Sequence, residues 1–192
     1  DGDYTVALGD INGGNAQAAV IASAYAFGGD LNNLDPAFDF WTQLAEDGRI
    51  NTLDILQQNF ETGEIPVGVI WSFTAIPYKN QITKYKLQAN IPTDGSIMSG
   101  YASVINKYAP HPCAAALARE YIFSDEGQAN LAAAGAIPTR TDVEIPEEIQ
   151  NATFKSEDYA NAIPMEDTDA YTKACETVVE RWQEEITPLL VQ

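Results

Sequence analysis

Short apolar runs alternate with longer stretches of helical periodicity along the first third of the chain. Residues 4–8 form an apolar run typical of a strand, and a Gly-rich loop separates them from an Ala-rich helix predicted over 16–27. Aromatic and aliphatic side chains recur at helical spacing over 35–45, and the spacing over 52–62 predicts a third helix, which Gly63 ends. The chain therefore opens with a strand, a Gly-rich loop and a helix.

The most apolar run of the chain lies at 66–71. Such a continuous run is typical of a strand that helices cover on both faces, as in a parallel sheet. A loop followed by a helix is predicted over 72–81, and the alternation of apolar and polar residues predicts a strand over 85–91. The sequence Pro-Thr-Asp-Gly-Ser at 92–96 is the clearest break, and a further strand is predicted over 101–105.

Helices dominate the pattern in the last part of the chain. They are predicted over 112–123 and 126–134, with a short one over 146–151. The last helix carries a single apolar stripe, made of Tyr171, Ala174, Cys175, Val178, Val179, Trp182 and Ile186. Because strands alternate with helices along the chain, the sequence predicts an α/β fold.

Charge narrows the classes of partner. The 192 residues include 10 Lys and Arg and 28 Asp and Glu, which gives a formal net charge of −18 with the single His neutral. Binding to nucleic acid or to an anionic membrane surface requires clustered basic residues, so neither is expected. No apolar run approaches the ~18 residues of a membrane span, and the N-terminus lacks the pattern of a signal segment. We therefore expect a mature product or an internal fragment, without a signal segment and with no membrane insertion.

Five stretches, taken in order, carry a family resemblance. The later ones are Ala-Pro-His-Pro at 109–112, Ser-Asp-Glu-Gly-Gln at 124–128 and Gly-Ala-Ile-Pro-Thr-Arg at 135–140, and the earlier ones lie at 24–38 and 63–69. Their order and spacing resemble those of the periplasmic solute-binding proteins of ABC importers. The likeness is to the two-lobed family 1 type, which includes ferric-ion, polyamine, thiamine and phosphonate binders.

The resemblance implies a two-lobed periplasmic-binding-protein fold of type 2, present here without the N-terminal part of lobe one. In this family the chain builds most of lobe one, crosses to lobe two and then returns. Residues 1–92 would form lobe two, 93–100 the hinge crossing, and 101–192 the returning, helix-rich part of lobe one.

The resemblance also implies a receptor that is not an enzyme. Such a receptor captures a small solute in the cleft between its lobes, closes around it and presents it to the membrane subunits of an ABC transporter. It works outside the cytoplasm, in the periplasm or anchored at the cell surface. A ligand-sensing domain of a receptor or regulator shares this architecture and is the alternative.

The first candidate site is the loop of Asn12, Gly13, Gly14 and Asn15, between the first strand and the first helix. Free N–H groups and the positive end of the helix dipole can hold an anion or a polar group there, and the glycines allow a ligand close to the backbone. The alternative is an ordinary strand-to-helix turn. In the family that the chain resembles, this loop faces the cleft. The helix N-terminus at this loop and the lack of metal ligands favour a small polar or anionic organic solute.

The second candidate site is Trp71, Ser72 and Phe73, after the apolar run. Ligands of open α/β sheets bind beyond the carboxyl ends of strands, where an indole and a hydroxyl could contact a solute. The alternative is a core Trp with a capping Ser. Ferric-ion binders of the family carry a Tyr-Tyr pair at this point, so Phe73 and Thr74 make a ferric ion the less favoured cargo. Asp94, at the predicted crossing, either reaches the cleft or caps its own turn.

The remaining candidates concern covalent and metal chemistry. Cys113 and Cys175 are the only cysteines, and an even count in an exported protein is consistent with a disulfide. Two separate thiols, with Cys175 on the apolar stripe, are the alternative. The single His111 has no nucleophile pattern beside it, and no cluster of carboxylates or histidines predicts a metal site. We therefore predict no catalytic residue, no metal and no cofactor.

Overall fold

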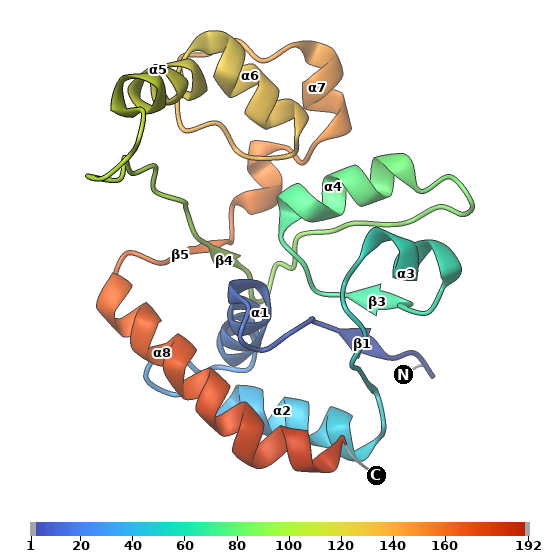
Figure 1. Ribbon diagram of the computed structural model, residues 1–192. Coiled ribbons are helices and arrows are strands. Elements are labelled where there is room, and N and C mark those ends of the chain that lie inside the picture. Colours follow the sequence, from blue (N-terminus) through green and yellow to red (C-terminus); the bar gives the residue numbers. More distant parts are fainter. Residues whose placement is uncertain (1–2, 191–192) are drawn as a thin grey trace. The chain divides into compact units, whose positions relative to one another are not determined.

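The computed structural model describes residues 3–190, which form two compact units (Figure 1). Unit 1 contains three segments of the chain: the residues up to Trp71, Asn90–Ser99 and the residues from Tyr159 onward. Unit 2 contains two segments, Ser72–Ala89 and Gly100–Asp158. Each unit is therefore built from segments that are separated in the sequence.

A three-stranded parallel sheet forms one part of unit 1. Strand β1 (Val6–Ala7) lies between β2 (Ile50–Asn51) and β3 (Val67–Gly68), and it is in register with both neighbours from its first residue. A second parallel pair joins β4 (Ile97–Met98) to β5 (Ile163–Pro164). Parallel neighbours require a crossover connection, and helices supply it between the strands of the first sheet. The chain is thus a mixed α/β protein with small sheets.

The helices of unit 1 come from both ends of the sequence. They are α1 (Gly14–Ala26), α2 (Asp35–Glu46), α3 (Gln57–Thr62) and α8 (Thr168–Arg181). Helix α8 continues through a π-helical turn, Trp182–Ile186, into the 3₁₀ turn Thr187–Leu189. Helix α2 begins where Pro follows Asp, because a Pro in the first turn sacrifices no helical hydrogen bond.

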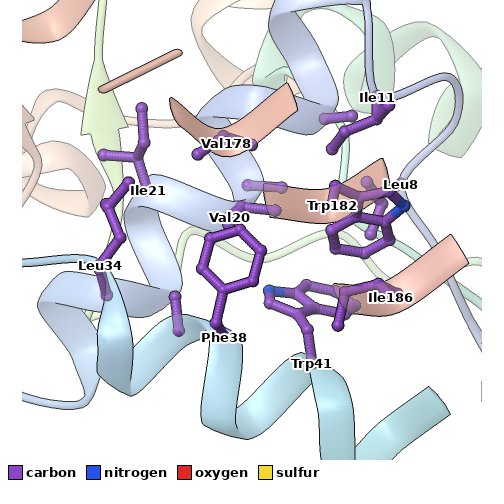
Figure 2. Close-up of a cluster of buried hydrophobic side chains, with 14 of the residues drawn as sticks. Leu8, Ile11, Val20, Ile21, Leu34, Phe38, Trp41, Val178, Trp182 and Ile186 are labelled. Atoms are coloured by element: carbon purple, nitrogen blue, oxygen red, sulfur yellow. The ribbon is translucent and has the colours of Figure 1, made fainter. Parts of the chain in front are cut away.

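The core of unit 1 lies between α1, α2 and the last helical segment (Figure 2). Phe38 and Trp41 of α2 are almost fully buried, and the ring of Trp41 meets that of Trp182 edge-on, with centroids 5.5 Å apart. The indole Nε1 of Trp41 donates to Ser23 Oγ at 2.9 Å, so this polar atom is satisfied inside the core. The apolar stripe predicted for the last helix therefore completes a core that the first two helices begin.

Unit 2 consists of helices joined by extended segments. Its helices are α4 (Ser72–Gln81), α5 (Pro112–Ile122), α6 (Asp125–Ala133) and α7 (Glu147–Ala152), and the 3₁₀ turn Ser156–Tyr159 leads out of it. Gly135 follows α6 with a φ of 90°, a left-handed conformation that favours Gly and ends the helix as predicted.

The Ser-Asp-Glu-Gly-Gln sequence forms the start of α6. Ser124 caps the helix, because its Oγ accepts from the N–H of Gly127 at 3.1 Å. The side chain of Gln128 is fully buried: Nε2 donates to the carbonyl of Ile122 at 2.8 Å, and Oε1 accepts from the N–H of Arg140 at 3.1 Å. The end of α5, the start of α6 and the segment after it are therefore joined through one amide.

Arg140 adds an ionic connection to the same place. Its guanidinium binds Asp125 at 2.8 Å and Asp142 at 2.7 Å, and it also donates to the carbonyl of Phe123 at 2.9 Å. The hydrogen bond from Arg140 lowers the pKa of Asp142. Two of the stretches that carry the family resemblance, 124–128 and 135–140, thus meet in a single hydrogen-bonded network.

Several elements differ from the sequence prediction. The sequence predicts strands over 85–91 and 101–105. In the described part of the chain, neither segment pairs with another strand, and without such pairing an extended segment does not form a sheet. The helix predicted over 52–62 begins only at α3, because Asn51 Oδ1 accepts from the N–H of Leu53 and holds the preceding residues in a turn. Helix α4 starts directly at Ser72, without the predicted loop.

The compact units are not the same segments as the predicted lobes. Helix α8 lies within 101–192, which the prediction assigns to lobe one, yet its apolar stripe packs against α1 and α2 from 1–92. The segment Ser72–Ala89 also groups with unit 2 and not with the residues before it. As lobe boundaries of a whole receptor, the ranges 1–92, 93–100 and 101–192 stay a prediction.

Candidate functional site

The loop after β1 is held in shape by Asp10, a residue that the sequence analysis did not single out. Its carboxylate accepts hydrogen bonds from the N–H of Asn12 at 3.0 Å and from Asn12 Nδ2 at 2.9 Å, and these bonds lower the pKa of Asp10. Its carbonyl accepts from the N–H of Gly13 at 2.9 Å. An Asp two residues before an Asn is a local signal for such a turn, and it could have identified Asp10.

Two buried side chains anchor this loop to the core. Leu8 precedes it and Ile11 lies within it, and both point into the cluster formed by the helices of unit 1 (Figure 2). Gln17, on the first turn of α1, donates from Nε2 to the carbonyl of Ile11 at 3.1 Å. The backbone of the loop is therefore fixed at both ends, while Asn12, Gly13 and Gly14 stay exposed.

Asn15 joins this loop to the end of β3. Its Nδ2 donates to the carbonyl of Leu8 at 3.1 Å and to the carbonyl of Val69 at 2.9 Å, and its Oδ1 accepts from the N–H of Trp71 at 2.9 Å. The loop 12–15 and Trp71 therefore lie side by side at the carboxyl edge of the parallel sheet. Ligands of open α/β sheets bind at this edge.

The first turn of α1 supplies unused backbone donors at the same place. Within residues 3–190, the N–H groups of Gly14, Asn15 and Ala16 donate to no carbonyl or side chain, and no side chain caps the helix. A Cβ added at Gly14 would meet no atom within 4 Å, so the space beside this residue is open. The helix dipole places partial positive charge there. These N–H groups can donate hydrogen bonds to an oxygen atom of a solute.

Ser72 and Phe73 follow Trp71 as the first residues of α4, and they belong to unit 2. Ser72 and Phe73 are both half-buried. The ring of Phe73 meets the ring of Tyr101 edge-on, with centroids 6.0 Å apart. A contact of Ser72 and Phe73 with a solute stays a prediction. Trp71 lies beside the loop 12–15 within unit 1.

Asp94 lies in unit 1 but at another place. The neighbouring Gly95 packs so closely on α1 that a Cβ there would overlap the carbonyl of Ala22. Ala22 is eight residues beyond Gly14, which is ~12 Å along a helix that rises ~1.5 Å per residue. The turn that contains Asp94 is therefore packed against the second half of α1, and the structure does not bring Asp94 to the loop 12–15.

Two pockets lie in the described part of unit 1, and the second of them includes Gln17 of the first turn of α1. One, of about 180 Å³, lies between the start of α2 and α8 beside Lys173 and Arg181, and the other lies on α1 and α8 around Cys175. Neither is lined by Trp71 or by residues 12–15. The first is smaller than the ~300 Å³ at which small-molecule sites begin, whereas the second, of about 520 Å³, is within the range of such sites.

The cysteines fall in different units. Cys113 is exposed in unit 2 and Cys175 is half-buried in unit 1, and both thiols are free in this structure. Burial raises the pKa of the Cys175 thiol. A disulfide between them stays a prediction. Across the described residues, no group of three or more His, Cys, Asp or Glu side chains is arranged to hold a metal ion.

Comparison with known proteins identifies the family. The family described as "Bacterial extracellular solute-binding protein" matches residues 2–163. None of the curated proteins compared with the chain matches it. Because the family match covers most of the sequence, the chain belongs to the bacterial extracellular solute-binding proteins. The resemblance carried by the five sequence stretches is thereby confirmed.

Membership of this family sets the broad function. Its members bind small-molecule solutes outside the cytoplasm for transport, with ABC transporters as their partners, and they are generally non-enzymatic. Among the described residues, no helix combines the length and the apolar character that crossing a bilayer requires.

Proposed function

We propose that this chain is the solute-binding receptor of an ABC importer, and that the solute binds at the carboxyl edge of the unit 1 sheet, against residues 12–14 and Trp71. The hydrogen bond from the N–H of Trp71 to Asn15 carries this proposal, because it supports a shared site for loops from two strands. The receptor holds its cargo and releases it unchanged.

The proposed solute is a small polar or anionic organic molecule. The open backbone donors at Gly14 and Ala16 suit a carboxylate, a phosphonate or a carbonyl oxygen. The segments of unit 1 that form the proposed site, 3–16 and 69–71, contain no Lys or Arg, and they include the Asp10 carboxylate. Because these segments supply no positive side chain, the site favours a solute with a single, weakly charged acceptor group over a polyphosphate.

The proposed mechanism is closure of a two-lobed receptor of type 2. A solute that contacts both lobes stabilises the closed state by the difference in its contacts with the two states. Exposed apolar side chains of unit 2 support a larger lobe: Tyr101, Val104, Tyr108 and Leu117 are between 72% and 84% exposed. A complete domain rarely leaves such side chains uncovered together, and further residues of the same lobe would cover them.

A ligand panel tests the proposed function. The purified chain is heated with monocarboxylates, amino acids, alkylphosphonates, thiamine, polyamines and ferric citrate, and its melting temperature is measured with each. A bound solute at a hundredfold excess over its Kd adds about 2.7 kcal/mol to the stability of the folded state. Stabilisation by one polar or anionic organic compound is the expected result, and stabilisation by ferric citrate alone would overturn the choice of solute.

Two glycine substitutions locate the site. Gly14→Val and Gly100→Val each add a side chain where a Cβ meets no atom within 4 Å, so neither should disturb folding. Gly14→Val fills the space beside the proposed solute and should abolish the thermal shift. Gly100→Val, in unit 2, should leave the shift unchanged. Loss of binding in both variants, or in neither, would contradict the position of the site.

A further inference from the structure

The side-chain amide of Asn15 is fully engaged with the protein. Its Nδ2 carries two hydrogens, and they are donated to the carbonyls of Leu8 and Val69. Its Oδ1 accepts from the N–H of Trp71. An Asn side chain offers two N–H donors on Nδ2, so no side-chain donor of Asn15 is left for a solute.

The three partners of Asn15 explain why an amide is needed. Leu8 and Val69 follow β1 and β3, and the last ladder bond between these strands runs from the N–H of Val69 to the carbonyl of Ala7 at 2.9 Å. Beyond it, Leu8 and Val69 both turn carbonyls toward the same place, and two acceptors cannot bond each other. A donor from outside the sheet has to bridge them, and Asn15 supplies it from the first turn of α1.

We propose that Asn15 is a positioning residue whose side chain extends the β1–β3 pairing beyond the sheet and holds Trp71 beside the first turn of α1, without this side chain binding the solute. The inference rests on the proposed solute site and assigns a different role to one of its predicted ligands. One side chain thus sets the separation between the backbone donors of α1 and the backbone of Trp71.

The matched variants are Asn15→Leu, Asn15→Asp and Gln17→Glu. Asn15→Leu keeps the volume and removes all three hydrogen bonds. Asn15→Asp keeps the acceptor for Trp71 but turns a carboxylate toward two carbonyl oxygens. Gln17→Glu makes the same amide-to-carboxylate change on the same helical turn, where the amide bonds only the carbonyl of Ile11, so it controls for charge near the helix start.

The first readout needs no solute. Amide hydrogen exchange is measured at Trp71 and, as a reference inside α1, at Val20. Asn15→Leu should speed exchange at Trp71 by about tenfold or more, because its hydrogen-bond acceptor is gone, while exchange at Val20 stays within about twofold of the wild type. Unchanged protection of the Trp71 amide in Asn15→Leu would overturn the inference.

The second readout is the pH dependence of unfolding for the two acidic variants. In Asn15→Asp the two facing carbonyls raise the folded-state pKa of the new carboxyl above its unfolded value. The variant is therefore destabilised at neutral pH and regains stability as the pH falls through the folded-state value, since a protonated carboxyl can again donate to one carbonyl. Gln17→Glu should show a smaller recovery. Identical pH profiles for the two variants would contradict a bridging role for Asn15.

The ligand panel separates this inference from the proposed function. If no compound of the panel stabilises the wild-type chain, the proposed site fails, while the exchange at Trp71 still reports on the bridge. If a compound binds the wild type and Asn15→Leu equally well, the site stands and the positioning role of Asn15 falls. The expected result is binding that is about tenfold weaker or more in Asn15→Leu.

Discussion

Replacing Gln128 with Met tests the network that joins α5, α6 and Arg140. The change keeps the length of a fully buried side chain and removes both of its hydrogen bonds, at 2.8 Å to the carbonyl of Ile122 and at 3.1 Å from the N–H of Arg140. Each hydrogen bond contributes about 1 kcal/mol net to stability, and a buried carbonyl or N–H that is left with neither its partner nor water costs more. We therefore expect the free energy of unfolding of unit 2 to fall by about 2–4 kcal/mol. Gln150→Met is the matched control, because Gln150 is exposed and water can replace its bond to Ile145.

Hydrogen exchange of the α6 amides measures this loss within unit 2. A loss of 2–4 kcal/mol corresponds to exchange that is about 30- to 700-fold faster, since about 1.4 kcal/mol is one factor of ten. Gln150→Met should change the same amides by less than about threefold. If Gln128→Met exchanged like Gln150→Met, the buried amide would not be what holds the two stretches together, and the packing of its methylene groups would have to account for its burial.

Three further predictions concern the core, an ion pair and the cysteines. Ser23→Ala leaves the buried Nε1 of Trp41 without its acceptor and should lower the free energy of unfolding by about 1–3 kcal/mol in urea; an unchanged midpoint would contradict it. The hydrogen bond from Arg140 lowers the pKa of Asp142, so this bond stabilises the fold above the unfolded-state pKa and is lost as the pH falls through the folded-state pKa. Wild type and Asp142→Asn should therefore differ in stability at neutral pH and converge once Asp142 is protonated in the folded state, as followed by circular dichroism. If Cys113 and Cys175 form a disulfide in the exported protein, a thiol-reactive reagent should label neither of them after denaturation without reductant. Labelling of both thiols would exclude the disulfide.

The elements that the sequence predicted best are those whose signal is local. The helices α1, α2, α5 and α6 agree with prediction to within about two residues at either end, because their apolar spacing and their Pro, Ser and Gly boundaries act within a single turn. Sheet pairing is a different matter. Strands of two residues, such as β2, β4 and β5, are too short to show an alternation of apolar and polar residues. The segment 85–91 does alternate, yet it pairs with no strand in the described part of the chain.

The candidate site was predictable in part for a similar reason. The loop 12–15 and Trp71 could be chosen because each follows an apolar run, and the parallel sheet then brings them to the same edge. The role of Asn15 could not be read from the sequence, because its partners lie up to 56 residues away and are backbone atoms with no residue identity of their own. The position of Asp94 could not be predicted for a different reason: its turn is fixed by the contact of Gly95 with α1, a packing constraint that no local pattern encodes. A contact of Asp94 with a solute stays a prediction.

The acidity of the chain bears on how such a site could hold an anion at all. A formal charge of −18 repels anions at long range, but at physiological salt this repulsion is screened over ~8 Å. Recognition then depends on donors that act at contact distance, and backbone N–H groups at the start of α1 do so without adding any side-chain charge. A site built from backbone is therefore compatible with an acidic surface, whereas one built from Lys and Arg would work against the composition of its own segments. The same logic explains why positioning matters here, because backbone donors cannot move to meet a solute and their neighbours must be held in place by residues such as Asn15.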